Sequence, residues 1–174
     1  MIEIKEAEPF EIEEIMKMEY KCFHPEVREK KELFLERMSV FPEGFIVLKE
    51  SDRYAGYMTS ELWEYRKERS RESFGINHSI AEVHDYKGKE LYITSFAVNP
   101  EFHGKKYGKL MFEMFLEKMM KCYSPKCISL IVAEKWEQAI KIYLKNGFEV
   151  VEKFDNFLED AEIHKNFIFM RKEL

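Results

Sequence analysis

The residues best suited to chemistry lie in a short connector between two apolar runs of the sequence. The connector follows Asn99-Pro100 and contains two glycines, Gly104 and Gly108, together with three lysines. A strand that turns through glycines into a helix leaves the backbone N–H groups of the first helical turn without partners. The helix dipole adds positive potential at the same place. The connector therefore predicts a site for an anionic ligand, most often a phosphate.

A second group of reactive side chains lies in the segment 66–89, which joins two predicted strands. Its first part is highly charged, and its second part contains His78, Glu82, His84 and Asp85. Connections of this length are usually functional lids or solvated insertions. Both interpretations stay open at this point.

The three cysteines, Cys22, Cys122 and Cys127, include no C-x-x-C pair. This usage predicts neither a disulfide framework nor a zinc knuckle, and it favours a reducing, cytoplasmic setting. The first residues lack the apolar core of a signal peptide, and no apolar run approaches membrane-spanning length. We therefore expect a cytoplasmic protein that does not use a membrane as a partner.

The composition limits the class of ligand. The chain has 174 residues, of which 45% are hydrophobic and 35% charged, and its formal net charge is −5. These values predict one soluble globular domain over residues 1–174 and argue against disorder. Since no basic surface is implied, nucleic acid is not expected as a partner.

Strand and helix patterns alternate along the chain. Apolar runs predict strands at Ile2–Ala7, Phe45–Leu48, Tyr54–Trp63, Leu91–Val98, Ile128–Val132, Phe148–Phe154 and Phe167–Met170. Helical spacing predicts helices that begin at Pro9 and Pro25 and others over Tyr107–Met120 and Trp136–Leu144, the last ended by Gly147. The fold class is therefore mixed α/β.

The order of these elements and two motifs resemble the GNAT superfamily of N-acetyltransferases. The family's first motif is [Q/R]-x-x-G-x-[G/A], and His103, Lys106 and Gly108 stand at its three positions, of which only Gly108 obeys the pattern. The second is an Ala-Ile-x-x-Tyr run that ends in Gly-Phe, which 139–148 matches well. Trp136 stands where many members carry an asparagine.

The resemblance implies a GNAT fold, a central mixed sheet of about seven strands flanked by about four helices, with acetyl-CoA as co-substrate. The pyrophosphate is expected on the N–H groups of 104–109, and pantetheine between the strands Leu91–Val98 and Ile128–Val132. The implied cofactor-binding residues are Phe96, Ala97, Val98, His103, Gly104, Lys105, Lys106, Tyr107, Gly108 and Lys109.

The resemblance also implies that Tyr143 is the general acid toward the departing CoA thiolate. A phenol titrates near 10 and a thiol near 8.5, so we expect Tyr143 to act mainly as a hydrogen-bond donor. The attacking amine needs a base, and His84 is the favoured candidate because imidazole titrates near neutral pH. Glu82, His78 and Glu61 are the other candidates. No metal is expected.

Several segments look like the arylalkylamine N-acetyltransferase branch, namely Phe41–Phe45, Gly56–Trp63 and the long insertion. The paired strand histidines of that branch would fall on Tyr92 and Thr94. The sequence thus predicts direct transfer of acetyl from acetyl-CoA to a primary amine, with a small amine as the preferred acceptor. Two alternatives remain, a protein N-terminal or lysine acetyltransferase and a non-catalytic acyl-CoA-binding module. The protein is expected to be a monomer or a homodimer.

Overall fold

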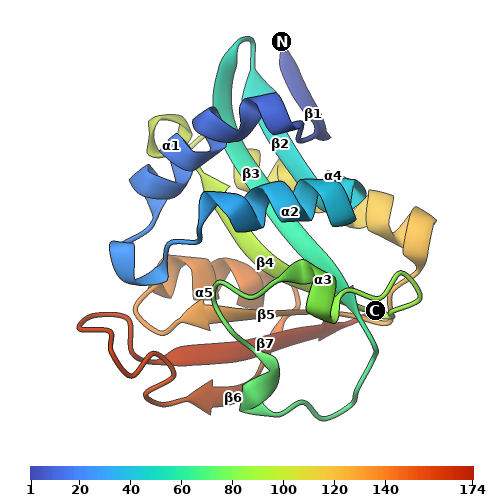
Figure 1. Cartoon of the computed structure of the whole chain (residues 1–174), viewed down its shortest axis with the longest axis vertical. Coiled ribbons are helices and arrows are strands. Elements are labelled where there is room, and N and C mark those ends of the chain that lie inside the picture. Colours follow the sequence, from blue (N-terminus) through green and yellow to red (C-terminus); the bar gives the residue numbers. More distant parts are fainter.

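A computed structural model describes residues 1–174 and shows one seven-stranded sheet with helices on both faces (Figure 1). The strands follow the order β1-β2-β3-β4-β5-β7-β6, and every neighbouring pair is antiparallel except β4 and β5. Their bounds are β1 (Ile2–Glu6), β2 (Phe45–Glu50), β3 (Arg53–Trp63), β4 (Glu90–Val98), β5 (Cys127–Ala133), β6 (Glu149–Phe154) and β7 (Phe167–Glu173).

The five α-helices divide between the two faces of the sheet. They are α1 (Ile12–Cys22), α2 (Lys31–Val40), α3 (Ile80–Val83), α4 (Tyr107–Tyr123) and α5 (Glu137–Lys145). Alternate residues of β2 explain the division, because Phe45 and Val47 pack with α1 and α2, whereas Ile46 and Leu48 pack with α4. The helix α5 packs against the same cluster as α4. This architecture confirms the predicted GNAT fold class.

Two elements differ from the sequence prediction. The second helix begins at Lys31 rather than at Pro25, because the chain makes a short 3₁₀ turn at 25–27 and is extended at Arg28. Val27 thereby leaves the helix and packs with Ala133 and Phe167. A fifth helix, α3, is a single turn inside the insertion 66–89.

The insertion is anchored to the sheet. Phe74 is buried between Trp63 and Tyr92, with ring centroids 5.7 Å and 5.6 Å away. Arg69 also pairs with the buried Glu90, at 2.7 Å. The insertion therefore covers one end of β3 and β4 and is not a freely solvated loop.

The strands β4 and β5 part soon after they begin to pair. Their parallel pairing runs only from Glu90 opposite Cys127 to Tyr92 opposite Ser129. Beyond that point β4 is paired with β3 alone, and the register of β3 and β4 shifts at Thr94. A bulge of this kind bends the strand that carries the extra residue. The result is an opening in the sheet between the carboxyl-terminal halves of β4 and β5.

The closed end of this opening is held by a buried carboxylate. Glu90 accepts hydrogen bonds from the Ser129 hydroxyl at 2.6 Å and from the Arg171 guanidinium at 3.1 Å, in addition to the ion pair with Arg69. These partners come from β5, β7 and the insertion. Because removal of one partner from a buried ion pair is strongly destabilising, Glu90 fixes the point at which the two strands separate.

No helix of the protein has both the length and the apolar character that are needed to cross a membrane.

We predict that Gly56→Ala destabilises the protein by about 1–3 kcal/mol, because its Cβ would overlap neighbouring atoms. That Cβ would lie 2.8 Å from the Ala97 carbonyl oxygen and 2.8 Å from the Met111 sulfur, where β3, β4 and α4 meet. Urea unfolding measures the effect. Gly75→Ala is the matched control, because its Cβ would meet nothing within 4 Å. Equal stability of the two variants would contradict the packing argument.

Candidate functional site

Two cavities meet at the opening between β4 and β5. The outer groove, of about 690 Å³, lies between the start of α4 and α5 and includes Gly104, Lys106 and Gly108. The inner pocket, of about 310 Å³, reaches through the opening toward α1 and includes Glu19 and Trp136. Both cavities are lined by Phe96, Val98, His103, Ala139 and Tyr143. A ligand in the groove would therefore present one end to the pocket at Tyr143.

The start of α4 offers backbone N–H groups to the outer groove. The N–H groups of Gly104, Lys106, Tyr107, Gly108 and Lys109 donate no hydrogen bond within the protein. The turn is made possible by positive φ angles, 84° at Gly104 and 62° at Lys106. Together with the dipole of the 17-residue helix, these donors are suited to the anionic ligand that the sequence predicts.

The left-handed conformation of Lys106 raises the free energy of the folded state, whereas a glycine would adopt it without strain. Lys106 stands at φ 62° and ψ 20° as the N-cap of α4, where the family motif has glycine. For an L-residue this conformation costs roughly 1–2 kcal/mol. The backbone at this motif position is therefore strained.

Only one of the three lysines has a free ammonium group. Lys105 pairs with Glu50 at 2.8 Å, and Lys109 lies 3.7 Å from Glu113. Lys106 is exposed and lies within ion-pair distance of no carboxylate. Of the three, Lys106 is therefore best placed to contact an anion in the groove.

Gly108 allows the first turn of α4 to rest on β4. An added Cβ would lie 3.4 Å from Val98 Cγ2 and 3.6 Å from Phe96 Cζ, which is ordinary contact. A larger side chain would push α4 away from the strand. The structure thus explains why this motif position takes a small residue, either glycine or alanine.

The carbonyl group at the end of β4 already has partners. The His103 ring nitrogen Nε2 lies 3.2 Å from the Val98 carbonyl oxygen, and the Cys22 thiol lies 3.6 Å from the same atom. His103, at the first motif position, therefore ties the turn back to the strand. Ala97 points the other way, into the cluster beneath α1 and α2.

Tyr143 stands on α5 between the two cavities. It is half-buried, its ring lies 5.4 Å from that of Phe148, and burial raises the pKa of its phenol well above the usual value. Gly147, at φ 88°, ends α5 so that the Phe148 N–H donates to the Tyr143 carbonyl at 3.0 Å. The phenol is thereby fixed in position and remains protonated at neutral pH.

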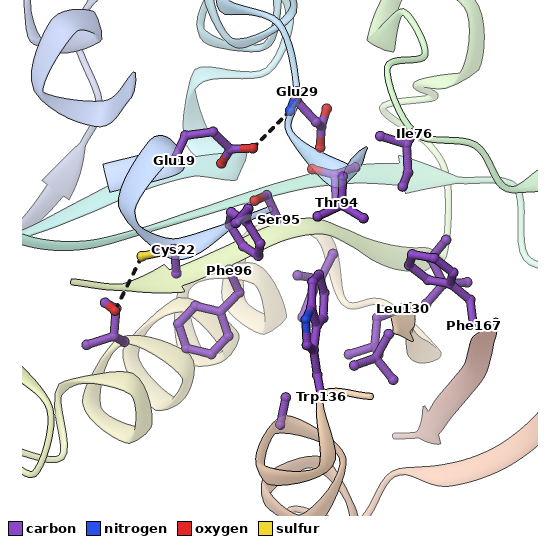
Figure 2. Close-up of a pocket in the computed structure, with 18 of the residues that line it drawn as sticks. Glu19, Cys22, Glu29, Ile76, Thr94, Ser95, Phe96, Leu130, Trp136 and Phe167 are labelled. Carbon is purple, nitrogen blue, oxygen red and sulfur yellow. Dashed lines mark hydrogen bonds between the residues drawn. The ribbon is translucent and has the colours of Figure 1, made fainter. Parts of the chain in front are cut away.

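The inner pocket has a buried carboxylate that the sequence analysis missed. Glu19, near the end of α1, accepts hydrogen bonds from the Tyr57 hydroxyl and, at 2.9 Å, from the Glu29 N–H. Burial raises the pKa of Glu19 to about 7. Figure 2 shows Glu19 and Glu29 on one side of β4 and the Trp136 indole on the other. The sequence did contain a signal for this residue. Glu19 follows Ile15 by four residues and so lies on the apolar face of the helix, where a carboxyl group is unusual.

A chain of charged groups continues from Glu29 into the insertion. The guanidinium of Arg37 bonds to Glu29 and lies 4.0 Å from Glu61. The carboxylate of Glu61 in turn lies 2.6 Å from His78 Nε2, while His78 Nδ1 lies 2.9 Å from the Gly75 carbonyl. Burial opposes protonation of His78, but its bonds to Glu61 and Gly75 raise its pKa overall. His78 and Glu29 line the inner pocket.

His84, the base favoured from the sequence, lies outside both cavities. Its Nδ1 accepts a hydrogen bond from the Leu62 N–H at 3.1 Å, and its ring packs 4.3 Å from Phe41. Burial lowers the pKa of this imidazole. His84 thus connects the insertion to β3 through this hydrogen bond. Glu82 is exposed on α3 and also lies outside the cavities.

The thiols are poorly suited to nucleophilic chemistry. Burial raises the pKa of Cys22, which lines the inner pocket, to about 11, and that of Cys127 to about 12. Cys122 is exposed at the far end of α4. Since the thiolate is the reactive form, no cysteine is activated at the site.

Comparisons with solved structures agree with this architecture. The loading GNATL domain of CurA from Lyngbya majuscula has a TM-score of 0.83 at 10% identity, over 99% of this chain and 98% of that one. Ard1 from Thermoplasma volcanium has a TM-score of 0.77 at 20% identity, over 99% of this chain and 97% of that one. Naa50 from Arabidopsis thaliana, bound to the bisubstrate analogue CoA-Ac-MVNAL, has a TM-score of 0.74 at 18% identity, over 99% of each chain. At these identities the likeness shows the fold.

A sequence search of curated proteins found no match. The profile of the Acetyltransferase (GNAT) family, however, matches residues 11–148, which include both motifs, the parted strands and Glu19. The match covers most of the chain and agrees with the anion site at α4. The chain therefore belongs to the Acetyltransferase (GNAT) family of acyltransferases.

Proposed function

We propose that the protein transfers acetyl from acetyl-CoA to a primary amine by direct attack. The pyrophosphate of the cofactor binds the N–H groups of 104–109, and pantetheine follows the outer groove to the opening beside β4. The acceptor amine occupies the inner pocket. The observation that carries this proposal is that the two cavities meet at Tyr143, with an anion site at one end and buried carboxylates at the other.

In the reaction the amine nitrogen attacks the thioester carbonyl, and the carbonyl oxygen becomes an oxyanion. Backbone N–H groups in the unpaired part of β4 are suited to stabilise that charge, a contribution typically worth about 3–4 kcal/mol. The C–S bond then breaks. The tetrahedral nitrogen releases its extra proton as the amide forms. The Tyr143 hydroxyl donates a hydrogen bond to the departing sulfur, which takes up that proton and leaves as CoA thiol.

The proposed base is Glu19, in place of His84. An alkylammonium titrates near 10.4, so about 4–5 kcal/mol is needed to deprotonate it at pH 7. A carboxylate with a pKa of about 7 is charged in roughly half of the molecules at that pH, and it accepts a proton more readily than an ordinary one. Glu19 takes the proton directly or through one water.

The inner pocket favours an ammonium group with an apolar body. Three buried carboxyl groups, those of Glu19, Glu29 and Glu61, are close to Arg37 and His78, and Glu19 and Glu29 line the pocket, so the pocket offers carboxylate oxygens to an ammonium group. The opposite wall contains Phe23, Ile131, Trp136 and Phe167. At about 310 Å³ the pocket suits a small amine. The arylalkylamine branch suggested by the sequence is consistent with this wall and stays a prediction.

We predict that acetyl-CoA with a panel of small primary amines releases CoA, and that Tyr143→Phe lowers kcat with little change in acetyl-CoA affinity. The reason is that the lost hydroxyl contacts the leaving sulfur only as charge develops. A coupled thiol assay measures the release. The panel includes short peptides, because Naa50 was solved with a peptide bisubstrate analogue.

Tyr20→Phe, an exposed tyrosine outside both cavities, is the matched control and should behave as wild type. Thermal stabilisation by acetyl-CoA with no CoA release on any acceptor would instead support a non-catalytic acyl-CoA-binding module. An unchanged kcat in Tyr143→Phe would remove the acid role.

We predict that Glu19→Gln lowers kcat/KM by about 100-fold or more and removes the inflection near pH 7 from its pH profile. Stability should respond as well. A raised pKa means that the native state holds its proton while the unfolded state has released it, so wild-type stability falls as the pH rises from 4.5 to about 7. Glu19→Gln should show a smaller fall in urea unfolding.

Glu14→Gln removes the same charge from the exposed part of α1 and is the control for both measurements. A wild-type pH profile in Glu19→Gln would show that another group is the base.

We predict that Lys106→Gly makes the free protein more stable by about 0.5–1 kcal/mol, because relief of the left-handed strain exceeds the extra chain entropy of glycine. The same change should weaken CoA binding up to about 5-fold through loss of the ammonium group. Lys106→Asn separates the effects, since asparagine tolerates this conformation but carries no charge. Calorimetric titration measures the CoA affinity and urea unfolding measures the stability. Unaltered CoA affinity in Lys106→Gly and Lys106→Asn would exclude the contact between Lys106 and a phosphate.

A further inference from the structure

We propose that His24, Glu26 and His164 form a binding site for a divalent transition-metal ion at the rim of the inner pocket. One nitrogen from each imidazole and one carboxylate oxygen lie within 4.8 Å of one another. The ligands come from two distant parts of the chain, the connection between α1 and α2 and the connection between β6 and β7. A bound ion would therefore link these two connections.

The carboxylate of Glu26 is already oriented for this role. It accepts hydrogen bonds from the backbone N–H groups of Glu162, Ile163 and His164, at distances from 2.6 Å to 3.2 Å. The Ile163 N–H is shared between the two oxygens, so three donors make four contacts, and a metal ion at Oε2 would displace the longer Ile163 contact, at 3.2 Å. The oxygen Oε2 lies 3.6 Å from His24 Nδ1. Carboxylates that bind metals are usually held by such hydrogen bonds.

The imidazole of His164 has a ring nitrogen that is free to bind a ligand. Its Nδ1 is buried and has no hydrogen-bond partner. The ring packs edge-on to that of His24, with centroids 5.7 Å apart, and lies 5.5 Å from Trp136.

Two imidazole nitrogens and one carboxylate suit zinc, cobalt, nickel or copper ions, rather than magnesium or calcium. Tetrahedral zinc, with bonds of about 2.0–2.1 Å, places its ligand atoms about 3.3 Å apart. Ligand atoms that lie as far apart as 4.8 Å must therefore approach one another by up to about 1.5 Å. The side chain of His24 is 39% exposed, so its rotation can supply much of this movement.

An ion at this place would fix one wall of the inner pocket. Phe23 and Val27 flank two of the ligands in sequence, and Trp136 packs on the third. All three line the inner pocket. The outer groove, in contrast, is lined by none of these three neighbouring residues. Metal should thus alter the KM for the acceptor and leave the affinity for CoA unchanged, while metal binding itself does not depend on the proposed transferase activity.

The test uses tag-free full-length protein in a Cys122→Ser background, because the exposed thiol is the main competing ligand. Calorimetry with cobalt chloride should show one ion per chain, and zinc should displace it. Cobalt should also quench the fluorescence of Trp136, owing to the contact with His164. His24→Ala and His164→Ala should each weaken binding by at least about 10-fold.

Urea unfolding without metal gives the fold control, and His24→Ala should lose there only the 3.3 Å hydrogen bond from the Glu26 N–H to His24 Nδ1 in an exposed turn. His103→Asn removes a histidine outside the cluster and should bind cobalt as the parent does. The proposal is wrong if the parent binds no cobalt, or if the double variant of His24 and His164 binds it as tightly as the parent.

Discussion

The site depends on one constraint, the early separation of β4 from β5. Parallel pairing stops after Tyr92 and Ser129, so the rest of β4 keeps unpaired backbone groups along an opening in the sheet. The buried Glu90 holds the closed end, and the shift in register at Thr94 directs the open end. Both cavities exist because of this separation.

Charge is distributed unevenly across the opening. On the α4 side the N–H groups at the helix start and the free Lys106 ammonium supply positive potential. On the α1 side three buried carboxylates share Arg37 and His78. This distribution of charge supports the proposal that a polyanionic cofactor and a cationic acceptor bind at opposite ends of one passage. The raised pKa of Glu19 follows from the same burial.

Departures from the family motifs have structural accounts. Lys106 adopts the left-handed conformation that the motif glycine would adopt, and it gains an ammonium group at the anion site. His103 bonds back to Val98 and stabilises the turn. Trp136 fills part of the inner pocket and packs between Phe23 and Phe167, so it narrows the pocket rather than leaving it open.

The sequence by itself determined the fold class, the strand order along the chain, the helix start after Gly104 and the position of Tyr143, because these depend on local periodicity and turn chemistry. The sequence could not show which ionisable residue is best placed to act as the base. His84 and Glu19 differ in what packs around them, and that is decided by contacts between residues far apart in sequence. Only the tertiary structure removed His84 from the cleft, brought Glu19 to it and placed His24 beside His164. The physical reason is that burial and neighbouring charges, which set a side chain's chemistry, are properties of the packed molecule.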